Sequence, residues 1–109
     1  APGGLFIDTS TVSPAVSAEV AEAAAARGVR YLRVTVSGNN HMAARAALTV
    51  MASGPRAAFD EVKPLLDCFG PNVFFVGEAE QARVLKLVIN LMIAGTGAML
   101  SEALALGRR

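Results

Sequence analysis

Residues 5–38, LFIDTSTVSPAVSAEVAEAAAARGVRYLRVTVSG, decide the fold class of this sequence. The stretch opens with a short apolar run, continues through small polar residues and many alanines, and ends in 31–36, a run rich in β-branched and aromatic residues. Ser13 is a favoured type of N-cap residue, and Pro14 suits the first helical position. Gly28 is typical of the residue that follows a helix end. The order strand, helix, strand predicts a βαβ unit with two parallel strands, and therefore an α/β sheet.

The rest of the chain continues the alternation. The run 47–51 indicates a third strand and 73–76 a fourth, with a helix over 55–69 that Pro64 should kink or shorten. From Ala79 onward the pattern predicts one helix that continues to the C-terminal region.

The composition limits the classes of protein that this chain can belong to. It has 109 residues, of which 53% are hydrophobic and 17% charged, so we exclude a disordered chain and a coiled coil. The formal net charge is +1, without the basic surface expected of a nucleic-acid-binding protein. The single cysteine, Cys68, cannot form an internal disulfide, which favours a reducing, cytoplasmic location. We expect Cys68 to be a small core residue.

The C-terminal helix is too apolar to be covered by so short a chain. Polar residues interrupt it before it reaches the roughly 20 apolar residues of a membrane span, so we expect no membrane partner. A helix that is apolar on nearly every side must be buried on every side. Two alternatives follow: it packs against a second copy in a homo-oligomer, or against another domain that is absent from this sequence. The apolar residues are Val84, Leu85, Leu87, Val88, Ile89, Leu91, Met92 and Ile93.

Two loops could form a ligand site. Residues 8–13 follow the first strand and 35–40 follow the second, and parallel pairing would bring Thr11, Ser37 and Gly38 to one sheet edge. Hydroxyls and free backbone N–H groups suit a carboxylate or phosphate. The alternative is that both loops are ordinary capping turns.

Lys86 and Asn90 are four residues apart and share one face of the C-terminal helix. A lysine in an apolar environment can exchange a proton at neutral pH, and an amide beside it could orient a substrate. The alternative is a surface lysine whose stem covers apolar atoms. His41 is the only histidine and has no second ligand near it, so we expect no metal site.

Several segments, in order, resemble the β-hydroxyacid dehydrogenases, a family that includes 3-hydroxyisobutyrate dehydrogenase and tartronate semialdehyde reductase. They are 6–11 (FIDTST), 31–38 with VSG at its end, 48–51 (LTVM), 76–77 (VG), 86–90 (KLVIN) and 101–103 (SEA). The resemblance implies interconversion of a 3-hydroxy acid and its semialdehyde with NAD or NADP. It also implies that 1–78 form the second half of a Rossmann-like domain with a parallel or mixed sheet. Residues 79–109 would be a long interdomain helix, truncated before an all-helical domain.

The resemblance also implies roles for individual residues. Thr11 would contact the cofactor, Lys86 would be the catalytic acid/base, and Asn90 would position the substrate. Ser37 and Gly38, with the adjoining Asn39, would bind the substrate carboxylate. The related 6-phosphogluconate dehydrogenases have histidine where this chain has Ile89, which disfavours a sugar-phosphate substrate.

This sequence departs from the family pattern at five positions. Arg33, Thr35 and Asn39 stand where the family has an acid, a proline and a glycine, and Glu80 and Ala82 stand where it has glycines. These side chains could crowd or recharge the pocket, so substrate choice or catalytic competence could differ from that of the family.

The sequence also has no Gly-x-Gly-x-x-Gly loop between a strand and a helix. It therefore resembles an internal fragment, and we expect no turnover by these 109 residues alone. The alternative function is a catalytically inactive fragment or relic that acts as a dimerising or interaction module.

Overall fold

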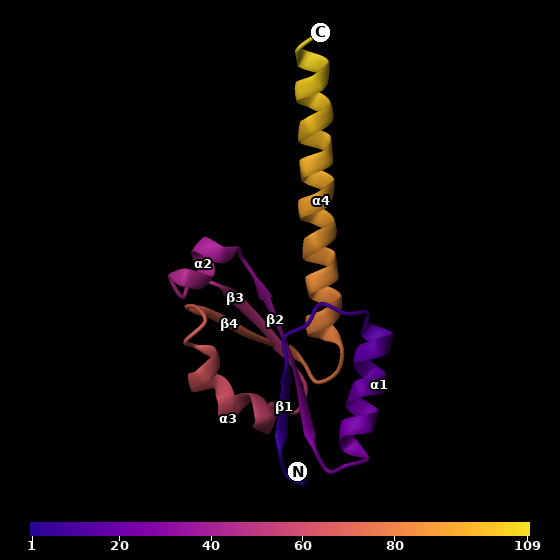
Figure 1. The fold of residues 1–109 in the computed structure, drawn as a ribbon, viewed down its shortest axis with the longest axis vertical. Helices are drawn as coiled ribbons and strands as arrows, with labels where there is room; N and C mark the ends of the chain where they lie inside the picture. The colour runs from indigo at the N-terminus through magenta and orange to yellow at the C-terminus, as the bar shows by residue number, and fades with distance from the viewer.

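A computed structural model describes all 109 residues and has the α/β architecture predicted (Figure 1). The elements in chain order are β1 (Leu5–Asp8), α1 (Pro14–Ala25), β2 (Arg30–Ser37), α2 (Asn40–Ala44), β3 (Thr49–Ser53), α3 (Arg56–Leu66), β4 (Asn72–Gly77) and α4 (Gln81–Gly107). The four strands form one sheet in the order β1-β2-β3-β4.

The sheet is mixed. β1 and β2 pair in parallel, with Asp8 opposite Arg33, which confirms the predicted βαβ unit. β3 runs antiparallel to β2, and β4 is parallel to β3. A parallel connection needs about a dozen residues or more, usually with a helix. The segment 38–48 between β2 and β3 holds only the short α2, so it joins the two strands in antiparallel orientation.

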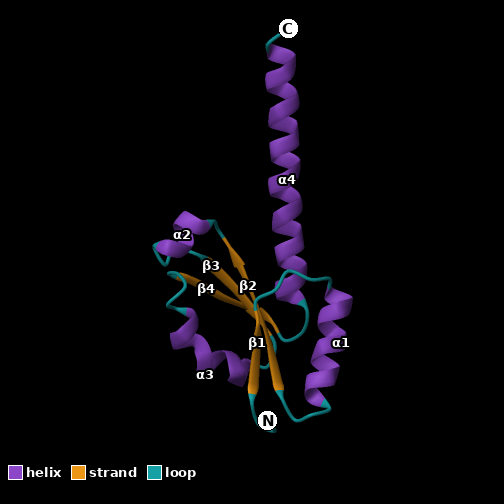
Figure 2. Ribbon diagram, in the orientation of Figure 1, coloured by secondary structure: helices purple, strands orange, loops and turns teal.

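The two faces of the sheet differ in chemistry. Successive side chains of a strand point to opposite faces, so each strand contributes to both. One face carries the apolar core beneath α3, and the core residues are Leu32, Val34, Val50, Ala52, Phe59 and Leu66. The other face lies against α1 and the first turns of α4, as Figure 2 shows. It buries Tyr31, Arg33, Thr35, Met51 and Ser53.

Local sequence signals predicted some element ends and missed others. The third strand, expected over 47–51, lies at Thr49–Ser53. The Ser13 hydroxyl accepts a hydrogen bond from the Val16 N–H at 3.2 Å and caps α1, as predicted. The helix α3 ends at Leu66, three residues before the expected end. The expectation for Cys68 was wrong: it follows the end of α3 and is exposed. The helix α2 was not predicted.

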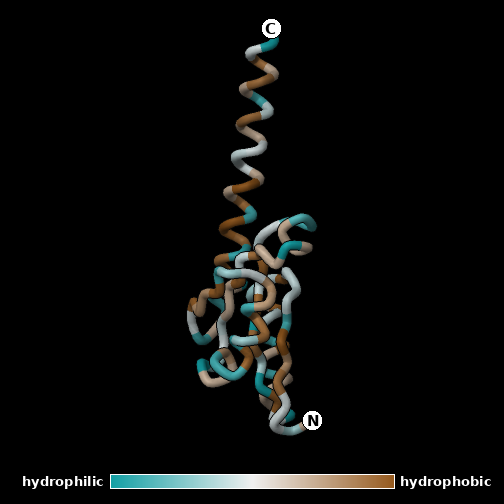
Figure 3. Tube along the Cα trace, turned by 90° about the vertical axis from the view of Figure 1, so that its left-hand side faces the viewer, coloured by the Kyte–Doolittle hydropathy of each residue, from teal (hydrophilic) through white to brown (hydrophobic).

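The helix α4 leaves the sheet and extends into solvent over most of its length (Figure 1). Only Ala82 and Arg83, in its first turn, are fully buried. Figure 3 shows apolar residues along much of the projecting part. The most apolar 18-residue stretch of α4 has a mean hydropathy of 1.7, so by length and composition alone this helix could cross a membrane. Core helices of other proteins meet the same test.

Candidate active site

Lys86 connects α4 to the carboxyl end of β2. Its Nζ donates a hydrogen bond to the Val36 carbonyl oxygen at 2.7 Å, and the residue is partly buried. Val36 immediately precedes Ser37, the last residue of β2. The ammonium is therefore held at the sheet edge where the β2 loop begins. Lys86 therefore has a polar partner within the fold and does not extend freely into solvent.

The loop after β1 contacts the same helix one turn earlier. The Arg83 guanidinium donates to the Ser10 carbonyl oxygen, so this loop touches α4 three residues before Lys86. Thr11 follows Ser10 in the loop and is exposed. The loop after β1 and the carboxyl end of β2 thus both contact the first two turns of α4.

Ser37, Gly38 and Asn39 form the turn between β2 and α2. Ser37 is partly buried, and the other two residues are exposed. The Asn39 Oδ1 accepts a hydrogen bond from the Met42 N–H at 3.0 Å and caps α2. The side-chain carbonyl of Asn39 is therefore occupied, and its Nδ2 and backbone N–H are the groups left for a ligand.

The fold itself requires a glycine at position 38. Its φ is +144°, a backbone conformation that residues with a side chain rarely adopt. A Cβ at this position would lie 2.6 Å from Leu48 Cδ2 and 3.3 Å from Met42 Sδ. Gly38 therefore has a packing role that is independent of any ligand.

Asn90 lies one helical turn beyond Lys86 and is exposed. It is on the part of α4 that has left the sheet. The structure therefore brings Lys86 to the carboxyl end of β2 and leaves Thr11 and Asn90 exposed to solvent.

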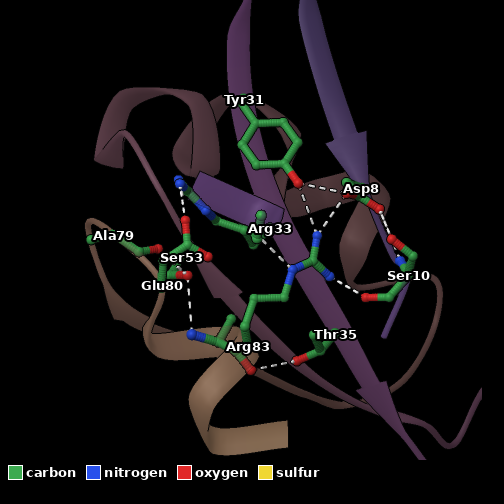
Figure 4. Close-up of polar contacts among 11 residues, drawn as sticks. Asp8, Ser10, Tyr31, Arg33, Thr35, Ser53, Ala79, Glu80 and Arg83 are labelled. Atoms are coloured by element: carbon green, nitrogen blue, oxygen red, sulfur yellow. Dashed lines mark hydrogen bonds and ion pairs between the residues drawn. The ribbon is translucent and has the colours of Figure 1, made fainter. Parts of the chain in front are cut away.

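A buried polar cluster that the sequence analysis did not identify lies beneath this edge (Figure 4). The Arg83 side chain is fully buried, and its Nη2 lies 2.7 Å from Asp8 Oδ2 and 3.0 Å from the Tyr31 hydroxyl. Its Nε donates to the Ser17 Oγ at 3.2 Å. These contacts join α4 to β1, β2 and α1. The sequence signal that could have indicated this cluster is Arg83 itself, a charged residue within the apolar first turns of the helix.

Asp8 is ionised within this cluster. Its partial burial opposes ionisation, but hydrogen bonds from Ser10 and Tyr31 and the positive charge of Arg83 outweigh that burial. The pKa of Asp8 consequently lies below its usual value. The Tyr31 hydroxyl donates to Asp8 Oδ2 at 2.5 Å.

Two of the departures from the family pattern pair with each other. Arg33 on β2 and Glu80 at the start of α4 form an ion pair (Figure 4). The Arg33 guanidinium also lies 4.8 Å from the centre of the Tyr31 ring. Arg33 Nε and Glu80 Oε2 have no partner. Because the charges are opposite and in contact, the Arg33–Glu80 pair is itself neutral.

A surface hollow of about 590 Å³ lies beside the first turns of α4. Its lining is mostly apolar and contains none of the predicted site residues. The lining residues are Val76, Ala79, Glu80, Gln81, Val84, Leu85 and Val88.

No three histidine, cysteine, aspartate or glutamate side chains meet in an arrangement that could hold a metal ion. Gly95, Thr96 and Gly97 lie inside α4, so they do not form a dinucleotide-binding loop between a strand and a helix.

Residues 1–77 match the family model of the NAD binding domain of 6-phosphogluconate dehydrogenase. The chain therefore belongs to this family of NAD-binding domains. Among curated proteins it is 34% identical to 2-(hydroxymethyl)glutarate dehydrogenase of Eubacterium barkeri over 105 residues. It is 38% identical to 3-hydroxyisobutyrate dehydrogenase of Pseudomonas aeruginosa over 103 residues. These matches cover 96% and 94% of this chain, and the homologues are β-hydroxyacid dehydrogenases.

The chain spans about 35% of the length of both relatives. It is also 30% identical, over 107 residues, to the human cytokine-like nuclear factor N-PAC, of which it covers 19%. The chain thus resembles one segment of several longer proteins, not all of which are named as dehydrogenases.

Solved structures agree with the sequence matches. A 3-hydroxyisobutyrate dehydrogenase from Salmonella typhimurium superposes with a TM-score of 0.88 at 35% identity, covering 100% of this chain and 39% of that one. An imine reductase variant from Myxococcus stipitatus, solved with NAD+, has a TM-score of 0.91 at 26% identity, covering 97% and 37%. The same enzyme has also been solved with NADP+. The predicted Rossmann-like fold and cofactor class are confirmed.

The residues of this chain fit one part of a dinucleotide site. Thr11 and its neighbours form an exposed loop at the carboxyl end of a parallel strand, where nucleotides bind in open α/β sheets. Lys86 and the β2 turn lie at the same edge. Hydroxyls, backbone N–H groups and an ammonium at one sheet edge suit an anionic ligand such as a carboxylate or a phosphate.

Proposed function

We propose that this chain carries the acid/base and substrate-binding segment of an NAD(P)-dependent 3-hydroxy acid dehydrogenase, which interconverts a 3-hydroxy acid and its semialdehyde. In this proposal, residues 1–78 are the second half of the nucleotide-binding domain, and 79–109 are the long helix between domains. The cofactor supplies the hydride acceptor when it is bound.

The proposal gives Lys86 the central role. Removal of the substrate hydroxyl proton must accompany hydride loss from the same carbon, and a group placed beside that hydroxyl speeds the step. Lys86 in its neutral form accepts the proton, and as ammonium it returns the proton in the reverse direction. Ser37, Gly38 and Asn39 bind the substrate carboxylate, Asn90 orients the substrate, and Thr11 contacts the cofactor.

The observation that carries this proposal is the hydrogen bond from Lys86 Nζ to the Val36 carbonyl oxygen. It supports a lysine fixed next to the hydroxyl of Ser37 and the free N–H groups of the turn that follows. A carboxylate bound to that turn would place the carbinol end of a short hydroxy acid near the ammonium.

The test is Lys86→Met in the natural protein that carries this chain. Activity would be assayed with NAD and NADP on 3-hydroxyisobutyrate and 2-(hydroxymethyl)glutarate, which the names of the two relatives above suggest. L-serine is the third substrate, because the chain is also 35% identical to an NAD-dependent L-serine dehydrogenase of Pseudomonas aeruginosa. We expect kcat to fall by about 10²- to 10⁴-fold with the fold unchanged by circular dichroism. Lys63→Met is the matched control, because Lys63 pairs only with Asp67 on the surface of α3, and it should retain activity.

Full activity of Lys86→Met would overturn the proposed chemistry. The isolated 109 residues should not turn over substrate, and measurable NADH oxidation by them with a three-carbon semialdehyde would contradict that expectation.

A second candidate is a non-catalytic interaction module, which the exposed apolar surface of α4 favours. We propose that α4 supports homo-oligomerisation under either function, and that the protein is cytoplasmic. The Lys86→Met variant discriminates between the candidates, since an interaction module would keep its partner and its biological effect without the lysine.

A further inference from the structure

The first turn of α4 is held by side chains from two strands. Glu80 at the N-cap makes no side-chain hydrogen bond to the helix. The Ser53 Oγ, from the end of β3, instead accepts the Ala82 N–H at 3.1 Å and donates to the Ala79 carbonyl at 2.8 Å. Ser53 therefore satisfies one of the free N–H groups at a helix start from another part of the fold.

Thr35 binds the carbonyl group of the same residue, Ala82. Its Oγ1 donates to the Ala82 carbonyl oxygen at 3.1 Å, with the Met51 carbonyl at 3.4 Å as the more distant acceptor (Figure 4). Thr35, Ser53 and Ala82 are all buried. Water therefore cannot readily replace either hydroxyl.

These two contacts converge on Lys86. In an α-helix the carbonyl of residue 82 accepts the N–H of residue 86, so the Thr35 hydroxyl binds the same oxygen as the Lys86 backbone. At the other end of the lysine, Nζ binds the carbonyl of Val36, which is adjacent to Thr35 in β2. The backbone of Lys86 is thus positioned through Thr35, and its ammonium through Val36, which are consecutive residues of β2.

We propose that Thr35 and Ser53 are positioning residues for Lys86. They fix the first turn of α4 so that the Lys86 ammonium lies at the carboxyl end of β2. This inference rests on the proposed function, because it concerns the same acid/base. The position of Thr35 matters chemically, since the proline expected there from the resemblance could not donate this hydrogen bond.

The test compares Thr35→Val, Thr35→Ser and Ser53→Ala in the natural protein that carries this chain. Valine keeps the shape of threonine and removes the hydroxyl, whereas serine keeps the hydroxyl. A displaced acid/base lowers kcat, so we expect Thr35→Val to reduce kcat by about ten- to a hundredfold at nearly unchanged KM. Thr35→Ser should restore most of it, and Ser53→Ala should act like Thr35→Val.

A matched control removes a hydroxyl from elsewhere on α4. The Ser101 Oγ donates to the Gly97 carbonyl at 2.9 Å on the exposed part of the helix. Ser101→Ala should leave kcat unchanged. A kcat loss equal to that of Thr35→Val in this control would overturn the inference.

A second readout does not depend on activity. Lys63 and Lys86 are the two lysines of these 109 residues, and after ¹³C labelling of lysine Cε in the natural protein their signals are assigned by their loss in Lys63→Met and Lys86→Met. Thr35→Val should shift the Lys86 signal and leave that of Lys63 in place, whereas Thr35→Ser should keep both near their original positions. An unmoved Lys86 signal in Thr35→Val would overturn the positioning role.

The outcomes separate this inference from the function on which it rests. If Lys86→Met is inactive and Thr35→Val matches the unmodified protein in kcat, the positioning role alone is wrong. If Lys86→Met is fully active, the acid/base role fails and the positioning role for it fails too.

Discussion

Arg83 is the most completely buried charge in the molecule, and its surroundings explain why it is tolerated. Removing a guanidinium from water is costly unless it is paired and its donors are satisfied. Here Asp8 supplies the countercharge, while Tyr31, Ser17 and the Ser10 carbonyl accept further hydrogen bonds. The cluster fixes the helix that carries Lys86 on the sheet face opposite the apolar core.

The lowered pKa of Asp8 predicts a specific acid sensitivity. The pKa of Asp8 is lower in the folded state than in the unfolded chain, where an aspartate has a pKa of about 3.9. Its contribution is therefore fully present above the unfolded value and is lost as the pH falls through the folded value. We expect Asp8→Asn to have a shallower loss of unfolding free energy between about pH 5 and pH 2, measured by urea denaturation.

Glu61→Gln is the comparison for that experiment. The Arg30 side chain lowers the pKa of Glu61, but the pair is exposed, so its contribution should be small. The assignment to Asp8 is wrong if Asp8→Asn keeps the acid dependence of the unmodified protein while Glu61→Gln loses it.

At the scale of the elements, the turn from β2 into α2 shapes the candidate site. The chain passes through Gly38 at positive φ, and Asn39 then caps α2. This turn holds Ser37 and the following N–H groups at the end of a strand that is central in the sheet. The turn was expected from the sequence, but the helix that it starts was not, since five residues give little periodic signal.

Two glycine substitutions should have opposite effects on stability. Gly38→Ala places a side chain at unfavourable φ against Leu48, so we expect a loss of about 1–3 kcal/mol in unfolding free energy. Gly95→Ala lies inside α4 with no atom near the added Cβ, so we expect a gain of about 0.5–1 kcal/mol. Thermal and urea denaturation measure both. Equal effects of the two would show that backbone strain at Gly38 is not the cause.

For the whole molecule, the dominant feature is a long helix without cover. The molecule measures 63 Å in its longest dimension and only 19 Å in its shortest, and α4 accounts for the length. Exposed apolar residues along it include Leu91, Met92, Ile93, Met99, Leu100, Leu104 and Leu106. So large an exposed apolar surface is typical of an interaction surface.

We therefore expect this chain to self-associate through α4. Sedimentation velocity should show a dimer or larger species, and Leu91→Lys with Leu104→Lys should return the chain to a monomer. Phe74→Lys is the control, because Phe74 is also exposed but lies on the edge strand β4. Self-association that persists in the α4 variant and disappears in Phe74→Lys would assign the contact to the sheet edge instead.

The sequence by itself determined the order of the four strands and of the three longer helices, but not the short α2, because the signals of the longer elements are local. Ser13 and Pro14 start α1, Gly28 follows its end, and the spacing of apolar residues separates strands from helices. The excess of apolar residues in α4 was also visible, since it needs only a comparison between composition and chain length. The family could be predicted because its characteristic segments survive in order.

The tertiary structure alone decided how the charged residues are used. Arg33 pairs with Glu80, Arg83 with Asp8, and Lys86 with the Val36 carbonyl, and these partners are 47, 75 and 50 positions apart in the sequence. No local pattern encodes such contacts, because they depend on how the sheet twists and where α4 crosses it. The antiparallel direction of β3 and the hydroxyl contacts of Thr35 and Ser53 with Ala82 arise in the same way: each depends on the three-dimensional packing of segments that are distant in the chain.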